Sequence, residues 1–452
     1  MMKSWNLRKI RKIKVSQIQF IAIGFALIIL AGALLLMLPF ATRDGQQTSF
    51  LNALFTATSA TCVTGLVAYD TFSHWTLFGQ LMILLMIQIG GLGFITVGVG
   101  FAMLFRRTIG LRERDLLKES ISATEVGGIL RLWQQIVKGT VLIEGTGALL
   151  LAIRFIPEFG VAKGIYYSIF HSISAFCNGG FDLMGSREAF SSVTAYVTDP
   201  LVNLTFCALI LIGGLGFVVW ADLAEHKLDY HHYSLHTKIV LSMLLILVAG
   251  GTLLMYLFER NATLADLSAG GKLWASLFGA VTARTAGFNS VDTASLTPAG
   301  KLLTMILMFI GGNPGSTAGG VKATTIAVLG VYMYSRLRNA SGTNLFHRRI
   351  SEEIIHKATL VCSLNLVLAL TAALIIMGSS SLAMDDVLFE VISAVSTVGM
   401  TTGITRELNT LGRIVIMLLM YCGRIGSVTF ALSLLQRPQQ KLKLPVERVN
   451  IG

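Results

Sequence analysis

Charged residues are scarce in this sequence. Of 452 residues, 13% are charged and 54% are hydrophobic, whereas about a quarter of an ordinary soluble domain is charged. A soluble protein of this size needs a charged shell around its cores, and 24 acidic and 36 basic residues are too few to form one. This scarcity excludes a typical soluble enzyme and predicts that lipid covers much of the surface.

Proline and cysteine are also scarce. Seven prolines beside 45 glycines in an apolar chain exclude a collagen-like or disordered protein. We therefore expect the glycines where helices touch or where the backbone bends. Five cysteines without a CxxC pair argue against a disulfide scaffold and against a zinc site. The sequence lacks a paired nucleophile and base, so we do not expect an enzyme.

Long hydrophobic runs occupy most of the chain. Eight apolar stretches reach the roughly 20 residues that a helix needs to cross a membrane, and they lie at about 18–40, 77–105, 134–156, 198–220, 237–258, 301–335, 357–378 and 410–435. A shorter apolar stretch lies within each consecutive pair, at 50–61, 163–176, 272–283 and 384–395. These shorter stretches cannot cross a membrane and predict half-helices in re-entrant loops.

Basic residues gather in alternate connecting segments. The segments 1–16, 106–133, 221–238, 336–357 and 436–452 hold 23 lysines and arginines. The alternate connections, 41–76, 157–200, 259–300 and 379–409, hold seven. Because basic loops stay on the cytoplasmic side, we expect both termini inside the cell and all four half-helices on the outer side of the membrane. The net charge of +12 reflects this asymmetry rather than a nucleic-acid partner.

Four turns of similar composition follow the four half-helices. Each turn contains a glycine, and Gly65, Gly180, Gly287 and Gly399 are separated by 115, 107 and 112 residues. Repetition of this length predicts four copies of one unit, each made of a helix, a half-helix, a glycine turn and a second helix. The predicted fold is an all-α membrane protein in which four re-entrant loops surround one pseudo-fourfold pore.

A second glycine pattern marks the second long helix of each unit. The segment 89–94, Ile-Gly-Gly-Leu-Gly-Phe, recurs letter for letter at 212–217 and degenerates to Ile-Gly-Gly at 310–312 and Gly-Arg-Ile-Gly at 423–426. Glycine inside a helix costs about 1 kcal/mol relative to alanine, so these glycines predict close approach of neighbouring helices. We place the units at 17–105, 134–220, 237–335 and 357–435, between a basic cytoplasmic segment 1–16 and a cytoplasmic tail 436–452.

The glycine turns predict a filter for cations. Irregular backbone at membrane depth is tolerated only where protein or a water-filled path satisfies its polar groups, and stacked carbonyls that replace a hydration shell form potassium filters. The negative C-terminal end of each half-helix also favours a cation. Glycine suits such a turn because it reaches backbone angles closed to other residues. The predicted filter residues, which would hold K⁺ by their backbone carbonyls, are Val63, Thr64, Gly65, Asn178, Gly179, Gly180, Thr285, Ala286, Gly287, Thr397, Val398 and Gly399.

The sixth apolar stretch is interrupted by a segment rich in glycine. Residues 311–322, Gly-Gly-Asn-Pro-Gly-Ser-Thr-Ala-Gly-Gly-Val-Lys, cannot hold a regular helix. Their order differs from that of a nucleotide-binding loop and no strand precedes them, so we reject nucleotide binding here. A flexible polar segment below the filter predicts a gate, and its residues are Gly312, Asn313, Gly315, Ser316, Thr317, Ala318, Gly319, Gly320 and Lys322, together with Arg424.

Some charged residues inside or beside the predicted spans are candidates for a functional role. The charge of Arg424 either opposes cation passage as a barrier, which we favour, or pairs with a carboxylate or with helix-end carbonyls. Arg284 either pairs with Glu390 or sets the electrostatics of the third turn. Glu144 or Glu390 would carry protons if the chain were a proton-coupled cation antiporter. That alternative predicts inverted repeats, whereas these four units run in the same direction.

The turns and the interrupted segment resemble those of one family. Thr61-Cys62-Val63-Thr64-Gly65-Leu66, SAFCNGGF at 174–181, RTAGFNS at 284–290 and STVGM at 396–400 are similar, in order, to the four filters of the Trk/Ktr/HKT superfamily, most closely to its bacterial KtrB-type membrane subunit. GSTAGGVK at 315–322 resembles the intramembrane gating loop of that family, and GRIG at 423–426 resembles its arginine segment. The resemblance covers nearly the whole chain, although the second filter has Asn-Gly-Gly where Asn-Ala-Gly is expected.

The resemblance implies a function and partners. It implies a membrane subunit for potassium uptake, in which the four turn glycines belong to the filter, the loop 311–322 gates the path and Arg424 contributes to the barrier. It also implies a homodimer with one pore in each chain, bound to a cytosolic ring of RCK regulatory subunits that bind ATP or ADP. Transport in such systems is often assisted by Na⁺. No organic cofactor is expected on this chain.

Overall fold

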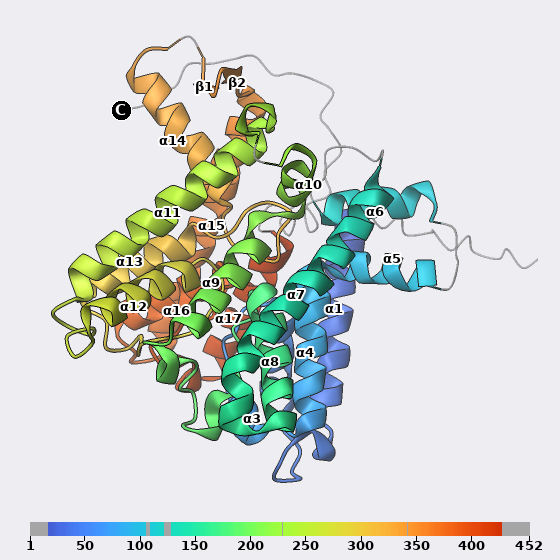
Figure 1. The fold of residues 1–452 in the computed structure, drawn as a ribbon, viewed down its shortest axis with the longest axis vertical. Helices are drawn as coiled ribbons and strands as arrows, with labels where there is room; N and C mark the ends of the chain where they lie inside the picture. The colour runs from blue at the N-terminus through green and yellow to red at the C-terminus, as the bar shows by residue number, and fades with distance from the viewer. Residues whose placement is uncertain (1–16, 105–108, 122–127, 228, 341, 427–452) are drawn as a thin grey trace, which may run out of the picture.

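The chain folds into a bundle of α-helices with one small β-hairpin (Figure 1). The computed structural model describes residues 17–104, 109–121, 128–227, 229–340 and 342–426. The basic segment and the tail predicted at the two ends, 1–16 and 436–452, lie outside these residues. Within them, the same three kinds of helix recur in each quarter of the chain, as the sequence repetition predicts.

A long apolar helix begins each quarter. Four unbroken helices in the described ranges are long and apolar enough to cross a membrane, and they are α1 (Gln17–Leu36), α7 (Ile129–Phe159), α11 (Leu235–Glu259) and α15 (Glu352–Ser379). Their outer faces carry exposed leucines: Leu142, Leu245 and Leu374 are 70%, 70% and 69% exposed. Such a surface is suited to hydrocarbon rather than water. The prediction of an integral membrane protein is confirmed.

A short helix follows each long one. These helices are α2 (Phe50–Thr61), α8 (Val161–Phe176), α12 (Ala269–Thr282) and α16 (Met384–Val395). Two of them have the predicted bounds, whereas α8 and α12 begin two and three residues earlier. The early start of α12 follows from Ser268, whose side chain accepts a hydrogen bond from the backbone of Gly271 and caps the helix. The C-terminal halves of all four are buried and form the interior of the protein.

The second long helix is sharply bent in the first two quarters. α4 (Leu77–Leu92) meets α5 (Phe94–Leu104) at Gly93 with a bend of 97°, and α9 (Pro200–Leu215) meets α10 (Phe217–His226) at Gly216 with a bend of 96°. The spans predicted at 77–105 and 198–220 are thus each divided by a bend that the sequence did not predict. Both glycines have positive φ, 82° and 101°, which other residues adopt at a cost. Figure 1 shows α5 leaving the bundle sideways.

The second helix is also interrupted in the other two quarters. α13 (Pro298–Phe309) and α14 (Ala323–Leu337) are separated by residues 310–322, as predicted for the sixth apolar stretch. α17 (Thr410–Ile425) ends at Gly426, whose φ is 96°. The remainder of the predicted fourth unit, up to residue 435, lies outside the described residues. Every second helix therefore bends or ends at the second glycine pattern.

Short elements complete the connections. Those within the quarters are η1 (Pro39–Ala41), α3 (Thr71–His74), η2 (Met184–Ser186), η3 (Thr194–Tyr196) and η5 (Ile404–Arg406). Those between quarters are α6 (Leu111–Ser120), η4 (Tyr230–His232) and the antiparallel strands β1 (Asn344–Leu345) and β2 (Arg348–Arg349). α6, α10 and the hairpin lie toward one end of the molecule and α3 lies toward the other (Figure 1). This division agrees with the predicted inner and outer segments.

Candidate functional site

The four glycine turns meet at one place. A Cβ atom built on Gly65 would lie 2.9 Å from the Cα of Gly180, and one built on Gly180 would lie 3.3 Å from the Cα of Gly287. One built on Gly287 would lie 3.2 Å from the Cα of Gly399, and one built on Gly399 would lie 2.9 Å from the Cα of Gly65. The contacts thus run through the quarters in order and return to the first. The four turns form a closed ring around one axis.

One carbonyl oxygen from each turn belongs to the same ring. The carbonyl oxygen of Gly179 lies 2.9 Å from the Cβ position built on Gly65. The carbonyl oxygen of Ala286 lies 2.9 Å from the Cβ position built on Gly180. The oxygens of Val398 and Thr64 lie closer still to the next two glycines. Each is the residue directly before its turn glycine, the predicted filter glycine, so the four oxygens share one register. Such an oxygen ring can replace the hydration shell of an alkali cation, and a side chain on any of the glycines would crowd it.

The backbone takes the same unusual conformation in all four turns. φ is positive at each filter glycine, between 69° and 96°, and also two residues earlier. The earlier residues are Val63 (φ 55°), Asn178 (59°), Thr285 (78°) and Thr397 (51°). A left-handed conformation costs a residue with a side chain about 1–2 kcal/mol. Strain at four equivalent positions is typical of a functional site, and alternation of left-handed and ordinary conformations turns successive carbonyls toward one side.

A hydroxyl residue near the end of each half-helix holds the turn. Its carbonyl accepts a hydrogen bond from the residue before the filter glycine, at 2.6 to 2.9 Å in the four turns. Its hydroxyl group binds the backbone on the other side of the turn, as Ser59 and Ser393 do by accepting from Gly65 and Gly399 at 3.0 Å. The four residues are Ser59, Ser174, Thr282 and Ser393. None of the four was predicted from the sequence, although each lies five or six residues before its glycine.

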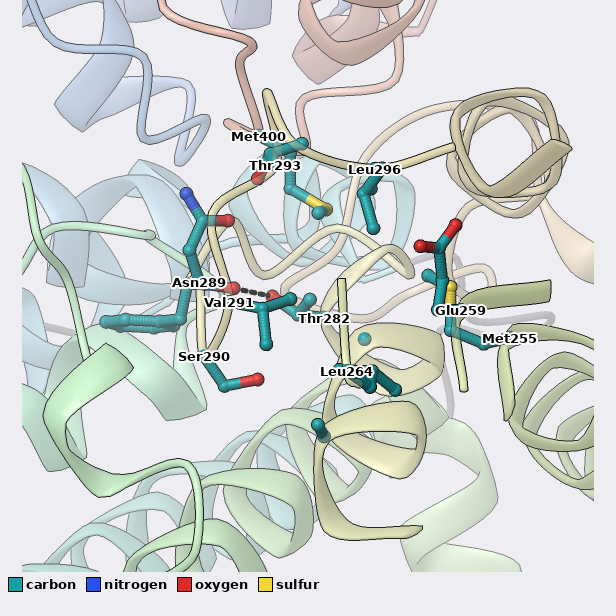
Figure 2. Close-up of a pocket in the computed structure, with 13 residues that line it drawn as sticks. Met255, Glu259, Leu264, Thr282, Asn289, Ser290, Val291, Thr293, Leu296 and Met400 are labelled. Atoms are coloured by element: carbon teal, nitrogen blue, oxygen red, sulfur yellow. Dashed lines mark hydrogen bonds between the residues drawn. The ribbon is translucent and has the colours of Figure 1, made fainter. Parts of the chain in front are cut away.

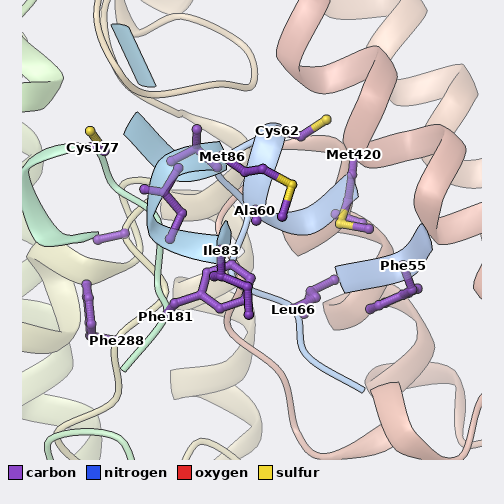
Figure 3. Packing of buried hydrophobic residues seen from close by; sticks show 14 of the residues in the cluster. Phe55, Ala60, Cys62, Leu66, Ile83, Met86, Cys177, Phe181, Phe288 and Met420 are labelled. Carbon is purple, nitrogen blue, oxygen red and sulfur yellow. The ribbon is translucent and has the colours of Figure 1, made fainter. Parts of the chain in front are cut away.

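A buried hydrophobic side chain follows each filter glycine. These anchors are Leu66, Phe181, Phe288 and Met400, and none is more than 4% exposed. Figure 3 shows the first three in the core that surrounds the turns. Burial of a side chain of this size contributes about 1.5–3 kcal/mol. The anchors and the hydroxyl bonds therefore hold each turn from both sides.

The glycine pairs of the second helices lie under the half-helices. A Cβ atom built on one of these glycines would overlap a carbonyl oxygen near the end of a half-helix. That oxygen belongs to the residue four positions before the filter glycine. The overlapping pairs are Gly90 with Thr61, Gly213 with Phe176, and Gly423 with Val395. In the first, second and fourth quarters the closely approaching neighbour is thus the half-helix of the same quarter, whereas Gly311 and Gly312 of the third quarter meet Gly319 and Ala318 of the interrupted segment. This contact places the break in the second helix just below the ring.

The predicted gate segment is fastened to the second quarter. Asn313 donates its backbone N–H and its side-chain amide to the carbonyl of Gly214, at 3.2 and 2.9 Å. Thr317 donates its hydroxyl to the carbonyl of Phe176, at the end of α8, at 3.1 Å. The carbonyl of Gly315 accepts from Phe217 at 2.7 Å. These bonds hold the segment against the base of the second turn.

The other half of the segment lies against the fourth turn. A Cβ atom on Gly320 would lie 3.0 Å from the Cα of Ser396, and one on Gly319 would overlap the hydroxyl oxygen of Thr397. Lys322 donates its ammonium group to the carbonyl of Ala318 at 2.8 Å. The segment therefore crosses beneath the ring.

Bonds inside the segment fix its shape. The hydroxyl of Ser316 donates to the carbonyl of Asn313 at 2.7 Å and accepts from the backbone of Ala318 at 3.2 Å. The carbonyl of Gly312 accepts from Ala323, the first residue of α14, at 3.0 Å. The segment is thus a defined loop rather than a structureless linker.

Arg424 joins this segment to the first quarter. Its guanidinium donates to the carbonyls of Thr317 and Gly90, and to that of Gly91 at 2.9 Å. These carbonyl contacts are those of one alternative for this charge, and the barrier role of Arg424 stays a prediction. Arg284 does not form an ion pair with Glu390 in the described part of the chain. Glu390 accepts instead from Thr401 and Thr405, at 2.6 and 2.5 Å.

Several buried polar atoms near the ring lack a partner. Within the described residues, no hydrogen bond reaches the side-chain oxygens of Thr61, Thr64, Asn178, Ser396 and Thr397. Buried polar groups are nearly always satisfied once water is included. Their concentration around the turns is typical of a hydrated path rather than a dry core.

Fold and site together define a class of protein, a helical membrane protein with four tandem units and a central ring of backbone carbonyls. A family described as cation transport protein, TrkH, matches residues 8–444. The chain belongs to this TrkH family of cation transport proteins, which confirms the resemblance predicted from the motifs.

Full-length relatives agree with this assignment. The chain is 40% identical over 456 residues to the potassium/sodium uptake protein NtpJ of Enterococcus hirae, an alignment that covers 98% of this chain and 99% of that protein. It is 40% identical over 436 residues to the Ktr system potassium uptake protein B of Bacillus subtilis, with 96% of each covered. The crystal structure of the potassium transporter TrkH from Vibrio parahaemolyticus has the same fold, with a TM-score of 0.72 and 17% identity over 95% of this chain and 87% of that one.

Proposed function

We propose that the chain is the ion-conducting membrane subunit of a potassium uptake system. The observation that carries the proposal is the closed ring of Gly65, Gly180, Gly287 and Gly399, with one carbonyl oxygen from each turn in the same register. Such a ring replaces water around an alkali cation, and the negative ends of four half-helices add to its preference for cations. The names of two full-length relatives as potassium uptake proteins support K⁺ as the transported ion.

The filter in this proposal comprises residues 63–65, 178–180, 285–287 and 397–399. The membrane potential drives K⁺ inward through it, because a charge that moves through 100 mV gains about 2.3 kcal/mol. The distribution of basic residues supports a membrane protein with both termini in the cytoplasm, and the resemblance to the bacterial KtrB type implies a bacterial cell membrane. In this orientation the ring faces the outer side of the membrane.

The loop 311–322 and Arg424 form the proposed gate. The loop crosses beneath the ring and is bonded to the second quarter, and Arg424 ties it to the first. The positive charges of Lys322 and Arg424 near the path oppose the passage of a cation. Conduction then requires the loop to move away from the axis.

The proposal also covers the assembly and the regulation of the chain. The resemblance of the turns and the loop to those of KtrB-type subunits implies a homodimer on a cytosolic RCK ring that binds ATP or ADP, and we include both in the proposal. The segments 221–238 and 336–357 would face that ring, since they lie at the end of the molecule assigned to the cytoplasm. Sodium-assisted transport is the remaining part of the proposal, and the name potassium/sodium uptake protein of one relative supports it.

Uptake of radioactive Rb⁺ into proteoliposomes tests the proposal. A K⁺ gradient that sets a negative internal potential should drive Rb⁺ inward through the wild-type chain, and vesicles without protein provide the control. External Na⁺ is added in a parallel series to measure sodium assistance. Uptake that requires a proton gradient, and not a potential, would overturn the channel-like function in favour of an antiporter.

A further inference from the structure

Four equivalent side chains lie on the half-helices, each nine residues before its filter glycine. They are Thr56, His171, Phe278 and Glu390, and they are 2%, 0%, 1% and 0% exposed. Because the units repeat, these side chains have equivalent places behind their turns. Two of them, His171 and Glu390, have titratable groups, and they belong to the second and fourth quarters. Since the ring runs through the quarters in order, these two quarters lie opposite each other across its axis.

Glu390 holds the segment that leads outward from the fourth turn. Its two carboxylate oxygens accept from the hydroxyl groups of Thr401 and Thr405, at 2.6 and 2.5 Å. Thr401 lies two residues after Gly399, and its hydroxyl oxygen accepts from the backbone of Gly403 at 3.0 Å. Among the described residues, no basic side chain forms an ion pair with Glu390. A fully buried carboxylate is costly unless it is hydrogen-bonded, so these bonds fix the path of the chain after the turn.

His171 holds the corresponding segment after the second turn. Its Nε2 accepts from the backbone N–H of Leu183, three residues after Gly180, at 3.2 Å. Because a backbone N–H can only donate, the proton of the neutral ring is on Nδ1, which donates to the carbonyl of Tyr167 at 2.7 Å. The ring of Phe155 packs against it edge to face, with the ring centroids 5.7 Å apart. Both nitrogen atoms of the buried ring are thus used, and the ring has one orientation.

Within the described ranges, the equivalent side chains of the other two quarters do not form such a bond. Thr56 donates its hydroxyl to the carbonyl of Asn52 in its own half-helix, at 3.0 Å, and Phe278 has no polar group. In the third quarter the half-helix reaches the segment after the turn through Thr282, whose hydroxyl donates to the carbonyl of Phe288 at 2.7 Å (dashed line in Figure 2). The second and fourth turns are therefore attached at one further point, beyond the hydroxyl residues described above.

We propose that His171 and Glu390 are positioning residues, which set the width of the ring along the diagonal from the second turn to the fourth. Each acts on the carbonyls of its turn through the segment that it holds. The preference of a carbonyl ring for one alkali cation depends on the number and the placement of its oxygens. Loss of either attachment gives one side of the ring the freedom to close on the smaller Na⁺. The inference rests on the filter function proposed above.

The ratio of K⁺ to Na⁺ permeability of the full chain, measured from reversal potentials in a bilayer, tests the proposal. Glu390→Leu and His171→Leu should each lower the ratio at least about fivefold, which corresponds to about 1 kcal/mol. His171→Gln should keep most of the wild-type ratio, because its amide oxygen can accept from Leu183 in place of Nε2. Glu390→Gln offers one oxygen to two hydroxyl donors and should lie between. Thr56→Val, at the equivalent place in the first quarter, should keep the wild-type ratio, because it removes only a bond within its half-helix.

Thermal melting of the same proteins separates positioning from a purely structural role. A purely structural role would lower the melting temperature of the leucine variants and leave their permeability ratio unchanged. A wild-type ratio in either folded leucine variant would therefore overturn the proposal, and so would equal losses in His171→Gln and His171→Leu. Where a leucine variant does not fold, Glu390→Gln decides, and a ratio equal to that of Thr56→Val would overturn the proposal. A wild-type chain that conducts Na⁺ as readily as K⁺ would instead overturn the filter.

Discussion

Removal of the Arg424 guanidinium should release the gate. Three carbonyls accept from this group, but only that of Thr317 belongs to the loop, whereas those of Gly90 and Gly91 belong to α4. The bond to Thr317 is therefore the one that loop movement breaks. A hydrogen bond with a charged donor contributes about 1.5–3 kcal/mol. Its loss shifts the ratio of closed to open protein by roughly 10- to 150-fold.

The assay for this prediction is Rb⁺ uptake into proteoliposomes that contain no other protein. Arg424→Gln should raise basal uptake about tenfold or more. The increase reaches its limit when most of the protein is open. Arg424→Lys keeps the charge, but its compact ammonium group cannot reach the loop carbonyl and the α4 carbonyls at the same time. Uptake by this variant should therefore be intermediate. Arg406→Gln, on the exposed outer surface, should match the wild type. Unchanged or reduced uptake by a folded Arg424→Gln protein would refute the reasoning.

Three further predictions concern the loop, a filter hydroxyl and a buried carboxylate. Deletion of residues 315–319 should also raise basal Rb⁺ uptake, since the segment would no longer cross beneath the ring, and unaltered uptake would remove its gating role. Ser393→Ala should lower the melting temperature, because the buried bond to Gly399 at 3.0 Å is lost at a cost of about 1–3 kcal/mol; an unchanged melting curve would contradict the bracing role. Glu144→Gln should leave Rb⁺ uptake intact, because this carboxylate contacts Gln88 at 3.4 Å and Cys177 behind the second turn, away from the ring axis. Abolition of a proton-dependent exchange by the same variant would favour the antiporter.

The repeated architecture was predictable because its signals are local. α2 and α16 begin and end at the predicted residues 50–61 and 384–395, where a short apolar stretch ends in a glycine turn. The interruption between α13 and α14 was predictable as well, since a segment with five glycines and a proline cannot continue a helix.

The right-angle bends at Gly93 and Gly216 were not predictable from hydropathy. Apolar residues continue through both positions, and hydrophobic composition alone does not indicate that a helix changes direction. The role of Ser59 and its counterparts was missed for a related reason, because a single serine in an apolar helix has many ordinary explanations. Only the comparison of its position across all four quarters would have indicated that each turn is held by a hydroxyl residue.

The ratio of K⁺ to Na⁺ permeability, measured from reversal potentials with the two ions on opposite sides of a bilayer, tests the central claim most directly. Serine is placed singly at Gly65, Gly180, Gly287 and Gly399, and Gly145→Ser, which meets no neighbour within 4 Å, is the control. Positive φ and crowding would distort the carbonyl ring in each filter variant. A loss of about 1 kcal/mol in K⁺ coordination relative to Na⁺ lowers the ratio roughly fivefold, and we expect at least this change. The control should keep the wild-type ratio. A filter variant that conducts with the wild-type ratio would contradict a single ring made by all four turns.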